Sequence, residues 1–144
     1  GFPTETKEDL MMTADLALGL LKENKNARVA GFYTFTPYVG TELFNVALQH
    51  GFQPPENLEG WIDYSRHHNM TPWITNEKEL RNIMYASKFL DMKRMGEFFN
   101  GNMLLKPLIG VYGRFNRLLW KRHVFGLRPD ISVIDYVARK HLGW

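Results

Sequence analysis

Two short loops carry the residue types best suited to hold a small polar ligand. The first, residues 1–6, begins with Gly1, and its Glu5 carboxylate can accept hydrogen bonds from a ribose or an amine, while Pro3 stiffens the turn. The second loop, residues 36–41, contributes Pro37, Tyr38, Gly40 and Thr41. Each loop precedes a predicted helix, whose first turn offers free backbone N–H groups and a positive dipole. Taken singly, each loop is also an ordinary strand-to-helix turn.

Residues 52–75 form a third candidate region, predicted to be a long loop dense in aromatic and polar side chains. Trp61 and Tyr64 are candidate substrate contacts, and His67 or His68 could reach a substrate carboxylate or donate a proton. Adjacent histidines point in different directions on regular structure, and no histidine or glutamate lies four residues away to support them. The remaining histidines lie near predicted helix ends, where a cation suits the dipole. We therefore expect no metal site.

The elements that position these loops alternate between helix and strand. Thr6 with Asp9 predicts a helix start, and apolar residues then recur at helical spacing. Residues 28–35 are apolar on both faces, which favours a parallel strand covered on both sides. Thr41 is a predicted cap of the next helix, which ends before Gly51. This order is typical of an α/β barrel, in which loops at the carboxyl ends of the strands build the active site.

The rest of the chain has a helical pattern. Asn76 with Glu79 predicts one helix start, a second helix is expected from about Pro107 to Gly126, and Asp130 is a predicted cap of a last short helix. The predicted fold class is therefore α/β but predominantly helical. We expect the last βα units of a partial TIM-like barrel in residues 1–60, followed by a helical extension in residues 61–144.

Composition limits the chemistry further. The chain has 144 residues, enough for one domain with a real core, and no cysteine, so it can form neither a disulfide nor a thiolate metal site. No apolar run approaches the roughly 20 residues that span a bilayer, and no signal peptide is present, so a cytoplasmic location is expected. Residues 1–65 have 4 Lys+Arg against 9 Asp+Glu, whereas residues 66–144 have 14 against 6, which suggests two structural units.

The two loops together resemble a known family. The pattern Gly-x-Pro-x-Glu-Thr-x-x-Asp, a strand, then Pro-Tyr-x-Gly-Thr-Glu-Leu and a helix ending in Gly-Phe resembles the later part of the radical S-adenosylmethionine (SAM) barrel. It is most similar to the branch with an N-terminal cobalamin-binding domain, which includes anaerobic magnesium-protoporphyrin monomethyl ester cyclases and cobalamin-dependent methyltransferases. The resemblance covers roughly residues 1–61.

The resemblance implies roles for individual residues. Gly1, Pro3 and Glu5 would lie on the turn beside SAM, and the four residues of the second loop, Pro37, Tyr38, Gly40 and Thr41, would lie at the barrel mouth. The parent enzyme would use SAM, a 4Fe-4S cluster and cobalamin for cyclisation, methylation or rearrangement of an unactivated carbon of a porphyrin-like or lipid-like substrate. Its partners would be the missing N-terminal barrel and the cobalamin domain. The cluster-binding cysteines would lie upstream of Gly1, so we expect this fragment to be inactive alone and to bind none of these cofactors stably.

A second class of function stays open for the basic end of the chain. Residues 103–144 contain 8 Lys+Arg and 2 Asp+Glu, and arginines and lysines between 114 and 122 alternate with aromatic and aliphatic residues. Such a segment suits a core-facing aromatic stripe with a basic outer face. It also suits a non-catalytic helical interaction module that docks a partner domain or a membrane surface. Nucleic acid is not expected, because no recognised motif accompanies the charge.

Overall fold

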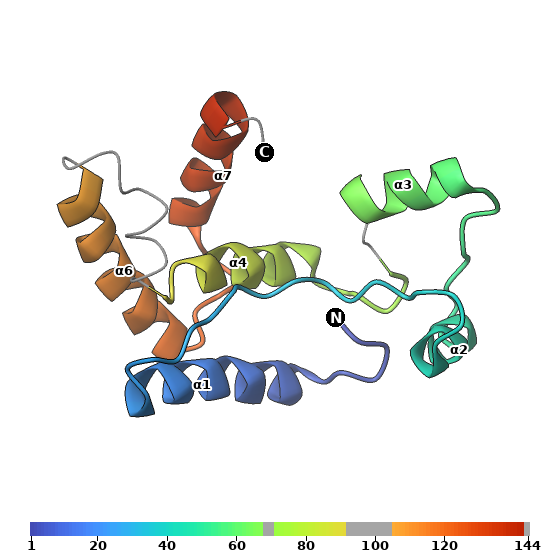
Figure 1. Cartoon of the computed structure of the whole chain (residues 1–144), viewed down its shortest axis with the longest axis horizontal. Coiled ribbons are helices and arrows are strands. Elements are labelled where there is room, and N and C mark those ends of the chain that lie inside the picture. The colour runs from blue at the N-terminus through green and yellow to red at the C-terminus, as the bar shows by residue number, and fades with distance from the viewer. Residues whose placement is uncertain (68–70, 92–104, 143–144) are drawn as a thin grey trace. The chain divides into compact units, whose positions relative to one another are not determined.

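The computed structural model describes residues 1–67, 71–91 and 105–142 (Figure 1). Its helices are α1 (Lys7–Glu23), α2 (Glu42–Gln49), α3 (Leu58–His67), α4 (Glu77–Lys88), α6 (Leu105–Lys121) and α7 (Pro129–Leu142). The prediction of a predominantly helical chain is confirmed. The described residues contain no strand, so the βα units of a barrel are not seen in them.

The chain forms two compact units. Unit 1 comprises residues 1–5 and 33–77, with α2 and α3, and unit 2 comprises residues 6–32 and 78–144, with α1, nearly all of α4, α6 and α7. Residues 6–32 thus belong with helices far along the chain. The predicted domains, residues 1–60 and 61–144, follow sequence order instead and stay a prediction.

Two predicted helix starts are confirmed at the level of single hydrogen bonds. At α1, the Asp9 amide donates to the Thr6 hydroxyl oxygen (3.1 Å), and the Thr6 amide donates to the Asp9 carboxylate (2.9 Å), which is a complete capping box. At α2, the Phe44 amide donates to the Thr41 hydroxyl oxygen at 3.1 Å. These bonds join residues three apart, so the local sequence suffices to specify them.

The predicted end of α2 is also confirmed. Gly51 follows the helix with φ 86°, a left-handed conformation that glycine adopts without steric cost. The Gly51 amide donates to the Leu48 carbonyl (3.1 Å) and the Phe52 amide to the Ala47 carbonyl (3.0 Å). This is the Schellman pattern, and it carries Phe52 back towards the helix, where its side chain is buried.

The strand predicted over residues 28–35 is not formed. Gly31, in its middle, has φ 101°, which interrupts an extended pleat. The Val29 amide donates to the Asp91 carboxylate (3.4 Å) and the Phe32 amide donates to the Ser87 hydroxyl (2.7 Å). In a sheet, the backbone of a neighbouring strand would accept such bonds. In the described part of the chain, these two bonds go to side chains instead.

The long loop predicted over residues 52–75 is wrong in part, because it contains α3. Asn57 was the missed start signal, since its side-chain oxygen accepts the Gly60 amide at 2.8 Å. Gly60 has a specific reason to be glycine, because a Cβ there would lie 2.9 Å from Pro55 Cβ. Two aromatic residues of this region, Trp61 and Tyr64, are therefore held on a helix.

The boundaries of the last two helices also differ from the prediction. α6 ends at Lys121 and not near Gly126, because His123 adopts φ 52° and the Val124 amide donates to the Leu119 carbonyl at 3.0 Å. α7 begins at Pro129, which places Asp130 in its first turn and not at the cap. Proline suits this position, because its missing N–H would have no partner in a first turn.

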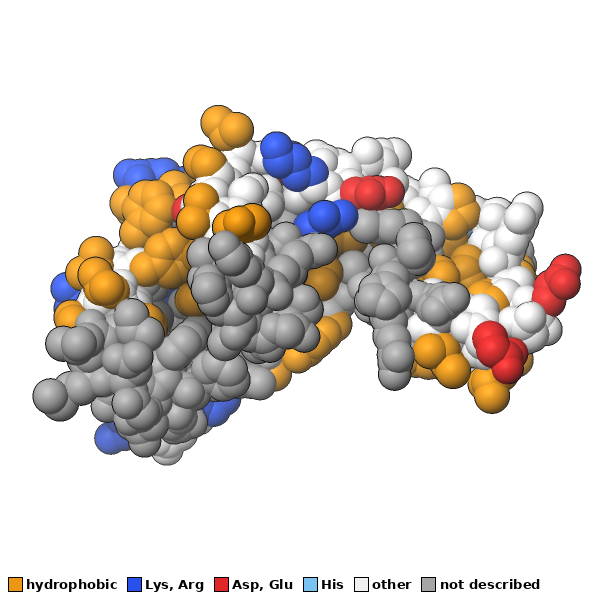
Figure 2. Space-filling view, turned by 90° about the horizontal axis from the view of Figure 1, so that it is seen from above, with side chains coloured by type: hydrophobic (Ala, Val, Ile, Leu, Met, Phe, Trp, Pro, Cys, Tyr) orange, Lys and Arg blue, Asp and Glu red, His pale blue; other side chains and the backbone are white. Residues whose placement is uncertain are grey.

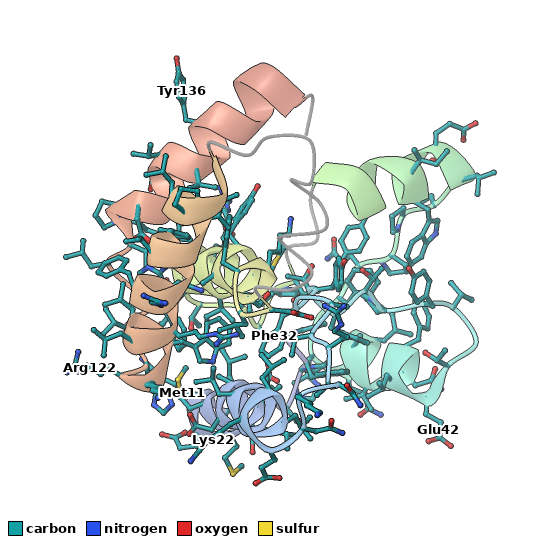
Figure 3. The ribbon with its side chains drawn as sticks, turned by 60° about the vertical axis from the view of Figure 1, so that its left-hand side comes forward. Met11, Lys22, Phe32, Glu42, Arg122 and Tyr136 are labelled. Atoms are coloured by element: carbon teal, nitrogen blue, oxygen red, sulfur yellow. The ribbon has the colours of Figure 1, made fainter. Side chains whose placement is uncertain are left out.

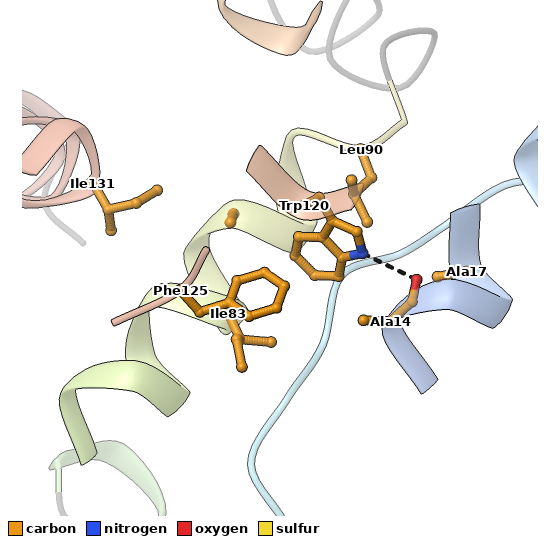
Figure 4. Packing of buried hydrophobic residues seen from close by; sticks show 8 residues of the cluster. Ala14, Ala17, Ile83, Leu90, Trp120, Phe125 and Ile131 are labelled. Atoms are coloured by element: carbon orange, nitrogen blue, oxygen red, sulfur yellow. Dashed lines mark hydrogen bonds between the residues drawn. The ribbon is translucent and has the colours of Figure 1, made fainter. Parts of the chain in front are cut away.

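Trp120 is the centre of the core of unit 2 (Figure 4). The buried apolar side chains are Ala14 and Ala17 of α1, Ile83 and Ala86 of α4, and Leu90, Trp120, Phe125 and Ile131. The indole N–H donates to the Ala14 carbonyl at 3.0 Å, and the Phe125 ring meets the indole edge-on with centroids 5.0 Å apart. Alanines on α1 leave the room that the indole needs.

Candidate functional site

Unit 1 contains all of the candidate site residues that the structure describes. Both loops lie in it, as do Trp61, Tyr64 and the backbone of His67, the last residue of α3. The His67 side chain and all of His68 lie outside the described residues. Sequence-distant candidates thus belong to one folded unit.

The first loop is a closed turn around Pro3. The Glu5 amide donates to the Phe2 carbonyl at 3.1 Å, and the Glu5 carboxylate forms an ion pair with the amino group of Gly1. The Trp73 indole N–H donates to the Gly1 carbonyl at 3.1 Å, which ties the turn to residues beyond α3. The Phe2 and Trp73 bonds therefore fix the turn that carries Glu5.

The second loop presents side chains above a fixed base. Pro37 is fully buried, whereas Tyr38 and Val39 are exposed and Gly40 turns the chain with φ 87°. The Thr41 hydroxyl donates to the Tyr38 carbonyl at 2.8 Å while its oxygen caps α2. Glu42, in the first turn of α2, projects outwards (Figure 3). Loop and helix start are thus one rigid feature with an exposed tip.

The two loops are connected by stacked rings. Phe2 of the first loop stacks on Phe35, just before the second loop, with centroids 4.8 Å apart and planes 28° apart. Such a pair contributes roughly 0.5–1.5 kcal/mol beyond the burial of its area. The loops therefore constrain each other.

Trp61 and Tyr64 belong to an aromatic cluster with Phe52. The centroid distances are 6.2 Å from Phe52 to Trp61, 5.5 Å from Phe52 to Tyr64 and 6.0 Å from Trp61 to Tyr64. The Tyr64 hydroxyl is buried without a hydrogen-bond partner in the described part of the chain, as is the Thr71 hydroxyl. Burial raises the pKa of Tyr64 above its usual range, so the phenol stays a neutral donor.

Nothing in the described residues assembles a metal site. No group of three or more His, Cys, Asp or Glu side chains there could hold an ion. His50 Nδ1 lies 2.9 Å from the Val46 carbonyl oxygen, and His123 Nε2 lies 2.9 Å from the Asp15 carboxylate. These contacts are those of helix-end histidines.

The most densely bonded polar cluster of unit 2 was not predicted. Arg128 is 1% exposed, and its Nε and Nη2 donate to the two Asp130 carboxylate oxygens at 2.9 and 2.8 Å. Nη2 also donates to the Asn116 side-chain oxygen (2.7 Å), and the Tyr112 hydroxyl donates to Asp130 (2.8 Å). The sequence signal was the polar pair at 112 and 116, four residues apart on α6, before Arg-Pro-Asp.

Electrostatics fix the protonation states in this cluster. Burial alone would raise the pKa of Asp130, but hydrogen bonds from Arg128 and Tyr112 and the Arg128 charge outweigh it, and the pKa lies below its usual value. Burial, and then the hydrogen bond to Asp130, raise the pKa of Tyr112 far above its usual range. The cluster is an ion pair with a neutral phenol, and it joins α6 to α7.

Comparison with protein families, with characterised proteins and with solved structures finds no match to this chain. Among the described residues, no helix is both long and apolar enough to cross a membrane. The loops and surfaces of the chain are therefore the basis on which its function is inferred.

Proposed function

We propose that this chain is the C-terminal part of a cobalamin-dependent radical SAM iron–sulfur enzyme, a cyclase-like oxidoreductase or methyltransferase. It would supply the loops on the SAM side and the substrate side of the active site. The supporting observation is that both loop motifs, separated by a whole helix in sequence, fold within one unit, where the partly buried Glu5 side chain offers a carboxylate that can bind an amino group. An amino acid cofactor such as SAM presents such a group.

The chain offers residues that suit one of the three proposed cofactors, SAM, but no cysteine ligands for the iron–sulfur cluster. Glu5 and the turn around Pro3 suit the amino end of SAM, which when bound to a reduced cluster supplies a carbon radical. The chain has no cysteine, so it does not provide ligands for the 4Fe-4S cluster. The cluster and cobalamin would depend on the N-terminal barrel and cobalamin domain, and residues 28–35 would pair as a strand only with those neighbours. A cytoplasmic location belongs to the same proposal.

The aromatic cluster is the proposed substrate side. Trp61 offers a partly exposed ring surface, and the unpaired Tyr64 hydroxyl offers a buried donor. A flat porphyrin-like or an apolar lipid-like substrate suits such surfaces. Of the histidines proposed as substrate contacts, His67 ends α3 and His68 follows it directly.

The parent enzyme provides the sharpest test. A Cys-x-x-x-Cys-x-x-Cys segment well upstream of Gly1 in the same reading frame is expected. In that enzyme, Glu5→Gln should weaken SAM binding at least about tenfold by calorimetry, because the amine loses its charged partner. Glu8→Gln, on the exposed first turn of α1, is the matched control. Equal binding by both variants would remove the proposed role of Glu5.

The isolated chain has its own test. Reconstituted with iron and sulfide and supplied with SAM and a reductant, it should form no 5′-deoxyadenosine. Formation of that product would show that the chain carries the chemistry by itself, contrary to the proposal.

An interaction module in residues 76–144 is the second candidate function. It is favoured by the large apolar side chains that α6 exposes beside basic ones. It requires no cofactor, and the absence of the upstream cysteine segment would make it the leading candidate.

A further inference from the structure

The outer face of α6 exposes four large apolar side chains in a line. They are Leu108 and Val111, each 66% exposed, Phe115 at 47% and Leu118 at 45%, and together they are called the α6 seam. The opposite face of the helix already packs into the core through Asn116 and Trp120, both fully buried. α6 therefore has a second apolar face beyond the one that its own fold uses.

The spacing of the α6 seam indicates what it fits. Its residues follow one another at steps of three, four and three, which are the a and d positions of a heptad repeat. Tyr112 and Leu119, beside the seam, are partly buried, so the apolar strip stays narrow. A narrow strip of this kind suits the side chains of one partner helix, whereas a helix lying on a membrane presents a broad apolar face.

The charge beside the α6 seam is of one sign. In the same register, Arg114 and Lys121 occupy the g positions of two successive heptads, and both are exposed. α6 contains no aspartate or glutamate. Arg122, just past the end of α6, projects outwards (Figure 3). Figure 2 shows apolar and basic side chains next to one another in its left-hand part. A partner therefore needs acidic side chains on the flank that faces Arg114 and Lys121.

We propose that the α6 seam docks an amphipathic α-helix from another chain or domain, with an apolar seam of its own and glutamate or aspartate on its flank. The inference is independent of the enzymatic proposal, and it deepens the second candidate function by naming the chemistry of the partner. The seam spans ten residue steps, about 15 Å of helix, so the docked helix needs about three turns.

The full chain can be tested with two designed three-heptad peptides. Both carry the same leucine and isoleucine seam, and one has glutamate and the other lysine at the flanking positions. Fluorescence anisotropy should show the glutamate peptide binding at least about tenfold tighter, since like charges oppose the lysine peptide. Equal binding of the two peptides would overturn the proposal.

A matched pair of apolar variants tests the seam itself. Val111→Ala with Leu118→Ala should weaken binding of the glutamate peptide at least about tenfold, because the seam loses two of its four apolar contacts. Met12→Ala with Leu16→Ala removes two side chains that are each 62% exposed on α1, and it should leave binding unchanged. Circular dichroism and urea midpoints check that both variants fold. An equal loss in the two pairs would show general stickiness and contradict docking on α6.

A charge exchange separates a docking role from a structural one. Arg114→Glu with Lys121→Glu should reverse the preference, so that the lysine peptide binds tighter than the glutamate peptide. Lys22→Glu with Lys78→Glu makes the same change of net charge at exposed positions on α1 and α4 and should not reverse it. If the two α6 cations had a purely structural role, the preference would not reverse. An unreversed preference would therefore contradict the proposal.

Two further outcomes would assign the seam to another occupant. Seam-dependent cosedimentation with phosphatidylcholine–phosphatidylserine vesicles, without peptide binding, would indicate an anionic lipid surface. A concentration-dependent dimer that the seam variant abolishes, again without peptide binding, would indicate a second copy of this chain. Either result would overturn the helix-docking proposal.

Discussion

At the scale of single residues, Trp120 connects α1, α4 and α6 within unit 2. Its ring is fully buried, meets Phe32 and Phe125 edge-on, and donates its N–H to the Ala14 carbonyl. Truncation of so large a side chain leaves a large void. It also removes the hydrogen bond that the indole N–H donates to the Ala14 carbonyl.

Trp120→Ala should therefore lower the free energy of unfolding by about 3–5 kcal/mol, measured by urea denaturation. Trp120→Phe keeps much of the packing and should cost less. Phe115→Ala, an exposed ring on the same helix, is the control and should change stability by about 0.5 kcal/mol or less. A similar loss for Trp120→Ala and Phe115→Ala would contradict this account of the core.

The buried Arg128 guanidinium is stable in the fold only because the Asp130 carboxylate balances its charge. Asp130→Asn leaves that charge uncompensated and should cost about 2–3 kcal/mol, below the range for fully buried pairs because Asp130 is 21% exposed. Asp15→Asn removes an exposed pair with His123 and should cost at most about 1 kcal/mol. Urea unfolding at neutral pH compares the two, and equal losses would rule out the cluster as a stabilising unit.

The lowered pKa of Asp130 also predicts how the free energy of unfolding falls at acid pH. Since this pKa lies below its unfolded value of 3.8, the carboxylate stabilises the fold above that pH and loses the contribution as pH falls through the folded pKa. A urea series across this range should show a shallower acid loss for Asp130→Asn than for the wild type. Parallel acid limbs would contradict the direction of the shift.

At the scale of elements, α2 shows how local bonds set a helix and a loop together. Thr41→Ala removes both the acceptor for the Phe44 amide and the donor to the Tyr38 carbonyl, and should cost about 1 kcal/mol. Thr41→Ser keeps the hydroxyl and is the control. Amide hydrogen exchange should show faster exchange at Phe44 in the alanine variant alone. An unchanged Phe44 amide would mean that the cap does not hold this turn.

Residues 28–35 illustrate a predicted element that the local sequence alone does not form. Apolar residues on both faces favour a strand, but every ladder bond needs an acceptor from a distant part of a chain. Here Ser87 accepts the Phe32 amide, and Gly31 turns the backbone out of the extended pleat. The apolar pattern indicates burial, but it does not specify hydrogen-bond partners. Here a side chain of α4 accepts a bond that a neighbouring strand would accept in a sheet.

At the scale of the whole molecule, the same segment can separate this chain from its proposed parent. In the isolated chain, the amides of residues 28–35 should exchange faster than those of α1 and α4, because no strand lies beside them in the described part of the chain. In the parent enzyme, strand neighbours should protect them about as well as the helices. Mass-spectrometric hydrogen exchange on both proteins measures this, and helix-like protection in the isolated chain would contradict the expectation.

The division into units is likewise a property of the whole chain. Residues 6–32 group with helices beyond residue 78, and residues 1–5 group with α2 and α3. The charge asymmetry of the sequence suggested two units but placed their border in the middle of the chain. Composition follows chain order, whereas compact units follow contacts, and the two need not agree.

The sequence by itself determined the features whose partners lie within a few residues. The capping box of Thr6 and Asp9, the Thr41 cap and the Gly51 turn were predictable because each bond spans a few positions and needs one residue type. The absence of cysteine likewise restricted the chemistry of this chain. The Asn57 cap of α3 obeys the same rule and could have been predicted from it.

Only the tertiary structure decided which distant groups meet. Three sets of contacts join residues at least 12 positions apart in the sequence. They are the stacking of Phe2 on Phe35, the bond from the Trp120 indole to the Ala14 carbonyl, and the bonds of Tyr112 and Asn116 to Asp130 and Arg128. Tertiary packing also showed that α6 has a buried face and an exposed apolar one, which helical spacing alone does not distinguish. The reason is physical: local hydrogen bonds compete only with water, whereas burial depends on which surfaces the whole fold brings together.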